Sequence, residues 1–242
     1  MSMMKFLWLI VGLFGFGFGA TAAQADPKQE LAQAIGSLQN KTNYSWTATT
    51  VPHGERTPWV QSPINGKTEK GGRTYFAFSI EGNQVEAAFL GTRSAINTDG
   101  VWELATELTG ERLALANRLQ AFKAPAVEAE ELLNQSQNLR RNRDGSFEAE
   151  LPAPVVKEML AERSRSGIQE GGPANPKGSV KFWVRNGVLE KFEYTLQGKI
   201  IIPDFRQEFD VDRTTTVEIK NVGSTRVTLP PAAMQKLSGP AR

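Results

Sequence analysis

The 242-residue sequence contains no cysteine and only one histidine, His53. Without cysteine no disulfide can form, and no lipid can be attached to a cysteine at a new N-terminus, so the chain is not itself a bacterial lipoprotein. Zinc and copper sites are usually built from several histidine or cysteine ligands, so such a site is nearly excluded. The stability of the chain must therefore come from the burial of apolar surface.

Patterns typical of catalysis are also missing. His53 lies in a segment rich in proline and glycine, where we interpret it as a solvated loop side chain and not as a general base. No serine lies in a nucleophile motif, and no glycine pattern of a phosphate-binding loop opens a helix. We therefore expect a protein that is not an enzyme and that uses no cofactor and no metal.

Carboxylates are plentiful but dispersed. Glu208, Asp210 and Asp212 alternate along one side of a predicted strand and would point the same way. Calcium sites use a loop turned by glycine, which is absent here. We interpret the three carboxylates as an exposed strand face balanced by Arg206 and Arg213.

The charge balance gives no electrostatic attraction to nucleic acid, because the formal net charge is only +2. One short basic cluster, Arg140–Arg143, is followed directly by Asp144. Cations near the C-terminal end of a helix are favoured by its dipole, so we interpret this cluster as a solvated helix end, with a lipid-headgroup site as the alternative.

The first 25 residues have the three parts of a secretory signal peptide. Lys5 precedes an unbroken run of apolar residues and glycine from Phe6 to Gly19, and the segment ends in Ala23-Gln24-Ala25. We predict cleavage after Ala25, which would leave one domain, residues 26–242, in the periplasm or cell envelope of a bacterium. An uncleaved N-terminal anchor is the alternative, although a membrane span needs about 20 apolar residues.

Hydrophobic periodicity and turn signals predict strands, then helices, then strands again. Helices are predicted over Asp26–Gln39, Glu111–Ala124, Pro125–Arg141, Pro154–Ser164 and Ala232–Leu237. The main predicted strands are Tyr44–Val51, an edge strand at Ile64–Lys70, Thr74–Ile80, Val85–Leu90, Arg93–Asn97, Val101–Leu108, Ser146–Leu151, Ser179–Arg185, Val188–Leu196, Phe205–Lys220 and Thr225–Leu229. Short strands joined by tight turns are typical of an antiparallel meander. The expected class is α+β.

Asn186-Gly187 is the strongest hairpin signal in the sequence. A two-residue loop there would pair Arg185 with Val188 and Trp183 with Glu190. Trp183, Phe192 and Tyr194 would then share one face of the sheet, and Phe182, Val184 and Leu189 the other. Because apolar side chains would lie on both faces, both faces must be at least partly covered.

Two segments and the order of the elements resemble the Lol-type periplasmic lipoprotein carriers (LolA and LolB) and their mycobacterial lipid-carrier relatives. The segment Ala95–Leu104, with Asp99-Gly100 before Trp102, is similar to a hairpin of that family, and Gly223–Pro230 is similar to its closing strand. The resemblance implies an incomplete barrel of roughly eight to eleven strands, in which a curved antiparallel sheet with helices on one face holds acyl chains in its hollow. The arginine-proline stretch of the carriers has no counterpart here; Arg93 is the nearest arginine.

Three classes of function follow. The first is an exported protein that binds a lipid or the acyl chain of a lipoprotein in the sheet hollow, and the second is a structural or protein-binding module of the envelope without a cavity. An enzyme is the third. If a ligand hollow exists, its lining is expected to include the following aromatic residues: Trp183, Phe192, Tyr194, Trp102, Phe76 and Phe78. The alternative is that these rings are ordinary packed core.

Overall fold

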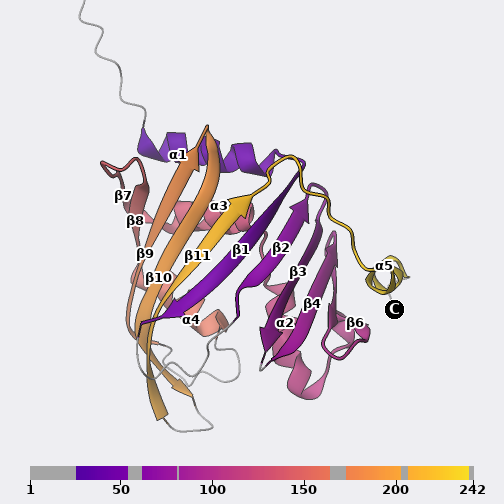
Figure 1. The fold of residues 1–242 in the computed structure, drawn as a ribbon. Coiled ribbons are helices and arrows are strands. Elements are labelled where there is room, and N and C mark those ends of the chain that lie inside the picture. The colour runs from indigo at the N-terminus through magenta and orange to yellow at the C-terminus, as the bar shows by residue number, and fades with distance from the viewer. Residues whose placement is uncertain (1–25, 54–61, 81, 164–172, 203–206, 240–242) are drawn as a thin grey trace, which may run out of the picture.

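Two strand meanders joined side by side form the backbone of the fold (Figure 1). The computed structural model describes residues 26–53, 62–80, 82–163, 173–202 and 207–239. The strands of the first meander are β1 (Asn43–Pro52), β2 (Ile64–Glu69), β3 (Arg73–Ile80), β4 (Asn83–Leu90), β5 (Arg93–Asn97) and β6 (Trp102–Leu104). Those of the second are β7 (Gln137–Arg141), β8 (Phe147–Leu151), β9 (Ala174–Arg185), β10 (Val188–Ile202) and β11 (Gln207–Lys220).

All eleven strands belong to one antiparallel sheet in the order β6-β5-β4-β3-β2-β1-β11-β10-β9-β8-β7. Each meander pairs strands that follow one another in the chain, and the contact of β1 with β11 joins the two. The sheet is curved and open, with β6 and β7 at its edges (Figure 1). The predicted class, α+β with a curved antiparallel sheet, is confirmed.

The pairing register divides the side chains of the sheet between two faces. Phe182 is paired with Phe192, Phe192 with Val217, and Val217 with Ala48, so these side chains lie on one face. We call this the inner face, because the main hydrophobic core forms on it. The opposite face, which carries Trp183 and Lys191, is called the outer face.

Helices cover the two faces unequally. The helices are α1 (Pro27–Gln39), α2 (Leu113–Gln120), α3 (Pro125–Gln135), α4 (Ala153–Arg163) and α5 (Pro231–Ser238), with two 3-10 turns at Ala105–Glu107 and Gly110–Arg112. The first four lie behind the sheet in Figure 1, on its inner face, as predicted for the central helices. The fifth packs on the outer face of β4–β6, so the helices are not all on one side.

Local sequence explains where α1 begins and why α4 packs closely against the sheet. Asp26 caps α1 by accepting a hydrogen bond from the backbone N of Lys28 at 3.0 Å, and Pro27 fills the first turn. Helix α4 approaches β9 closely because Gly178 has no side chain: a Cβ there would lie 2.7 Å from Val156 Cγ2. This close approach buries Val156 and Leu160 against the sheet.

Several predicted elements are wrong in type or extent. Helix α3 ends at Gln135, and residues 137–141 form the edge strand β7, so the basic cluster is not a helix end. Pairing with β8 overrides a run of residues that are all tolerated in helices. The strand β2 lies between β1 and β3 and is not an edge. Residues 225–229 form no strand, although their extended chain buries Val227 and Leu229 on the outer face.

The Asn186-Gly187 hairpin is confirmed, but its register is not. Both turn residues have positive φ, 52° and 71°, as a type I′ turn requires, and Arg185 pairs with Val188. A bulge between Leu189 and Lys191 then shifts the pairing, so that Trp183 lies opposite Lys191 instead of Glu190. Beyond a bulge, each side chain of the bulged strand lies on the face opposite to the one that an uninterrupted ladder predicts.

Candidate functional site

The structure does not bring the six predicted ligand residues together. Because of the bulge, Phe192 and Tyr194 point to the inner face with Phe182, whereas Trp183 points to the outer face. The prediction that Trp183 shares a face with Phe192 and Tyr194 is therefore wrong. Phe76 and Phe78 are on the inner face of β3, far along the sheet, and Trp102 is on the outer face of β6.

Phe192 and Tyr194 belong to the packed part of the inner face. Their side chains are 0% and 1% exposed, and their ring centroids lie 6.4 Å apart. The Tyr194 hydroxyl donates a hydrogen bond to Glu128 Oε1 of α3 at 3.1 Å. This hydrogen bond ties β10 to the helix layer, as expected for a buried tyrosine that needs a polar partner.

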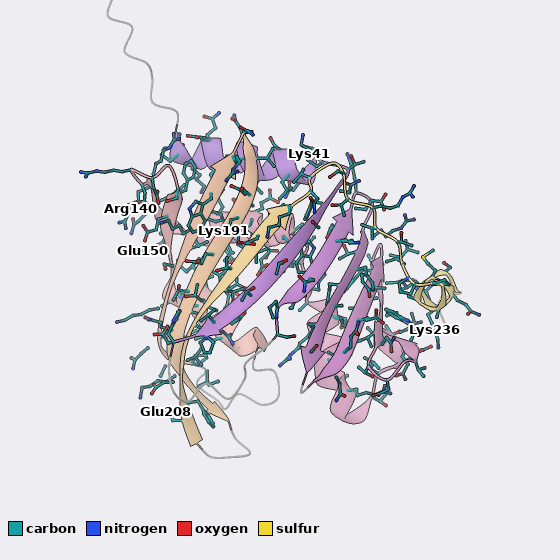
Figure 2. All side chains as sticks on the ribbon, in the orientation of Figure 1. Lys41, Arg140, Glu150, Lys191, Glu208 and Lys236 are labelled. Atoms are coloured by element: carbon teal, nitrogen blue, oxygen red, sulfur yellow. The ribbon has the colours of Figure 1, made fainter. Side chains whose placement is uncertain are left out.

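Trp183 is held between two lysine side chains on the outer face. The Nζ of Lys191 lies 3.6 Å from the centre of its ring, and that of Lys181 lies 5.0 Å away. Lys191 can be located in Figure 2 on the side of the sheet that carries no helix here. A half-buried tryptophan with cations over its ring covers a strand surface and lines no hollow on the inner side.

Trp102 belongs to a second, smaller hydrophobic cluster. It packs with Ala88 and Ala95 on the outer face of β4–β6, beneath Leu229 and Leu237 from the chain end. The C-terminal segment and α5 thus cover an apolar patch that the main core does not reach. Arg93 fastens this cover by donating to the backbone oxygens of Lys236, at 3.1 Å, and of Gly239.

Aromatic rings gather on the inner face of β1–β4. The ring of Phe122, from the segment between α2 and α3, lies 4.9 Å from that of Phe76, 4.8 Å from that of Phe89 and 6.0 Å from that of Trp46. Phe78 adjoins Phe76 at 6.1 Å. Phe122 is therefore the residue that covers the other rings, and it is half-buried itself.

Trp46 is the best fixed member of this group. Its indole Nε1 donates to Thr68 Oγ1 at 3.1 Å, and its ring lies flat against Gly66, where a Cβ would come within 2.2 Å of it. On the same face of β1, two residues before Trp46, burial raises the pKa of the Tyr44 hydroxyl. The hydrogen bond that this hydroxyl accepts from the backbone N of Ala126 opposes that rise in pKa. We call the rings of Trp46, Phe76, Phe78 and Phe89 the aromatic floor. It is held most firmly at β1 and β2.

A half-buried apolar strip borders this floor and is the candidate site. Ala48 and Ile64 form the last pair of β1 with β2, after which β1 continues to Pro52 along β11 alone. Phe78 adjoins them, because Ala77 next to it is paired with Asn65. We call Ala48, Ile64 and Phe78 the central strip. All three are half-buried, whereas Val217 and Phe192 in the same row are fully buried.

Only part of the central strip could be found from the sequence. Phe78 was expected to line a hollow, and Ala48 lies within the predicted strand Tyr44–Val51. Ile64 was missed because its strand is short and was expected at an edge. Phe122 lies within the predicted helix Glu111–Ala124, and nothing in the local pattern distinguishes a covering residue from a core residue.

The other predicted polar features are surface contacts. His53 Nε2 lies 2.7 Å from Thr214 Oγ1. Lys199 pairs with Glu208 and, at 3.7 Å, with Asp210, while Gln197 donates to Asp212 at 3.1 Å. Glu208 can be located in Figure 2. In the described ranges no three histidine or acidic side chains group as a metal site would require.

Of the two arginines expected to balance the carboxylates, Arg213 does not lie on their face. Arg213 follows Asp212 in β11 and so points to the opposite, inner face. Arg206 lies outside the described residues. Among the described residues, Lys199 and Gln197 of β10 supply the partners of the acidic row.

Comparison with known proteins gives similarity in structure only. No family model matches the chain, and neither does any curated protein. Among solved structures, LprF from Mycobacterium bovis is similar over 86% of this chain and 97% of its own, with 11% identity and a TM-score of 0.47. The lipoprotein LppX from Mycobacterium tuberculosis is similar over 84% of this chain and 98% of its own, with the same identity and TM-score. None of the helices in the described ranges is long and apolar enough to cross a membrane.

Proposed function

We propose that this chain is an exported, non-enzymatic envelope protein that binds an apolar ligand, a lipid or the acyl chain of a lipoprotein, on the inner face of its sheet. The observation that carries this proposal is the central strip. Phe192, Val217 and Ala48 lie in one row across β10, β11 and β1. Phe192 and Val217 are fully buried, whereas Ala48, in the last pair of β1 with β2, is only half-buried. Half-exposed apolar surface beside a group of aromatic rings is typical of a binding site.

The cover of the aromatic floor supports the same proposal. Helix α2 has only eight residues, its N-terminus has no side-chain cap, and Leu113 at its start is 52% exposed. Each aromatic contact of Phe122 contributes about 0.5–1.5 kcal/mol beyond the burial of its apolar area. An acyl chain that took the place of the Phe122 ring would contact Phe76 and Phe89 and continue along the central strip.

In this proposal the predicted residues have different roles. Phe76 and Phe78 contact the ligand, and Phe192 and Tyr194 support the floor from the packed half of the sheet. Trp102 and Trp183 are on the other face and have no part in binding. The competing function is a structural or protein-binding module without a ligand, which the full burial of Phe192 and Tyr194 favours for their half of the sheet.

Binding of a fluorescent apolar probe tests the proposal. Residues 26–242 are titrated with 1-N-phenylnaphthylamine, whose emission rises on entering an apolar site. We expect saturable binding that Phe78→Lys weakens at least tenfold, because a charge in the strip opposes an apolar ligand. The matched control Ala77→Lys changes the neighbouring, outward side of β3 and should leave binding unchanged.

The same titration separates the two functions. If the folded wild type binds no apolar probe, or if Phe78→Lys binds as well as the wild type, the ligand proposal fails and the structural module remains. Circular dichroism and urea unfolding of each variant show whether the protein has folded. Native mass spectrometry after gentle purification adds a direct look for co-purified lipid.

A further inference from the structure

Two threonine hydroxyls lie beside the central strip on the inner face. Thr50 and Thr215 are directly paired in β1 and β11, one inner-face row beyond Ala48 and Val217. Their Oγ1 atoms are 3.0 Å apart. Thr215 is only 4% exposed and Thr50 is half-buried, so the pair extends from the core to the edge of the strip.

One of the two hydroxyl hydrogens of this pair is not used in the hydrogen bond between the threonines. Two hydroxyls carry two hydrogens, and one O–H···O contact uses one of them. Neither threonine has another side-chain hydrogen-bond partner among the described residues. Buried hydroxyls are normally satisfied, so the second hydrogen is available for an acceptor that arrives from outside.

Two other polar side chains lie close to this pair on the inner face. Tyr194, opposite Thr215 in β10, donates to Glu128, and Arg213 in the next row also interacts elsewhere in the chain. The row on the other side is apolar, with Ala48 and Val217. A hydroxyl donor beside an apolar strip is an arrangement that can fix one polar atom of a mostly apolar ligand.

Building on the proposed function, we propose that Thr50 and Thr215 select the ligand by donating a hydrogen bond to an acceptor oxygen at the head of its acyl chain. The oxygen belongs to an ester or to a carboxylic acid. The chain itself lies along Ala48, Ile64 and Phe78, and the threonines determine its register on the sheet.

Competition between matched C16 ligands tests this role. Methyl hexadecanoate, hexadecanoate and hexadecane, delivered from cyclodextrin, compete for bound 1-N-phenylnaphthylamine on the wild type and on Thr50→Val/Thr215→Val. The double variant keeps the shape of both side chains and removes both hydroxyls, so it should fold. We expect it to lose about two- to tenfold in affinity for an oxygen-bearing ligand and nothing for hexadecane.

A second hydroxyl pair provides the control. Thr195 and Thr214 lie in β10 and β11 with their Oγ1 atoms 2.9 Å apart, on the outer face. Thr195→Val/Thr214→Val should leave all three affinities unchanged. Whether the ester or the acid loses more identifies the source of the oxygen. If Thr50→Val/Thr215→Val binds all three ligands like the wild type, the role of the pair is refuted while apolar binding stands; if no ligand binds the wild type, the proposed function itself fails.

Discussion

Phe182 and Trp183 are adjacent in the chain but lie in opposite environments. Phe182 is fully buried on the inner face, where it packs with Phe192, and Trp183 lies half-buried between two lysines on the outer face. The sequence alone predicted that Trp183, and not Phe182, shares a face with Phe192, because it assumed a two-residue turn without a bulge. A single bulged residue decides which aromatic ring is core.

Alanine substitution at these two positions should give unequal losses of stability. Trp183→Ala removes a surface ring and its cation contacts, so we expect a cost of about 0.5–1 kcal/mol. Phe182→Ala leaves a cavity in the core and should cost about 3–5 kcal/mol. Urea unfolding of both variants measures the difference. Equal losses would mean that Trp183 is also part of a packed core.

Tyr75 makes the stability sensitive to alkaline pH. Partial burial and the hydrogen bond to Glu86 raise the pKa of its hydroxyl far above the ordinary value of 10. The folded chain keeps this proton at pH values where the unfolded chain releases it. The contribution to stability is therefore complete below about pH 10 and is lost as the pH rises further.

The urea midpoint, measured from pH 8 to 11, should thus fall above pH 10, and it should fall less steeply in Tyr75→Phe. Lysines titrate in the same range, and the comparison with the variant removes their part. An identical pH dependence of the two proteins would show that Glu86 does not hold the Tyr75 proton.

At the level of elements, the cover formed by residues 225–239 is attached differently from the strands. It contributes no strand to the sheet, and its apolar contacts form the small outer cluster around Trp102 and Leu237. Such a segment can open without disturbing the main core. Arg93 ties it down through the backbone oxygens at the end of α5.

Hydrogen exchange should reveal this independence. Amides of α5 are expected to exchange faster than those of β9 and β10, and Arg93→Ala should speed up exchange in α5 alone. Mass spectrometry of peptides from both regions provides the measurement. If the substitution accelerates exchange equally in β10, the cover and the core unfold as one unit.

Predictability also differed between elements for physical reasons. The Asn186-Gly187 turn could be predicted because only a few residues accept positive φ at both turn positions. The strand β7 could not, because Gln137–Arg141 are compatible with a helix and only pairing with β8 makes them extended. The candidate site depends on which strands pair with β1, and local periodicity contains no such information.

On the scale of the whole molecule, the predicted export signal implies a defined mature chain. We expect the protein from the envelope fraction of a bacterial host to begin at Asp26, the residue that caps α1. Intact-mass measurement checks this. A chain that begins at Met1 or Ser2 would instead indicate that the leader is kept as an anchor.

The joint between β1 and β11 also governs how such a chain can fold. Ser45 pairs with Lys220, so the central contact of the sheet links segments from near the two ends of the described sequence. Contacts between distant segments form slowly, because a long loop must close before they contribute. Each meander can assemble from neighbouring strands, but the inner face is complete only after β11 has been synthesised. The central strip belongs to the first meander, whereas Thr50 and Thr215 pair across this joint, so the polar end of the surface proposed for the ligand is among the last parts to form.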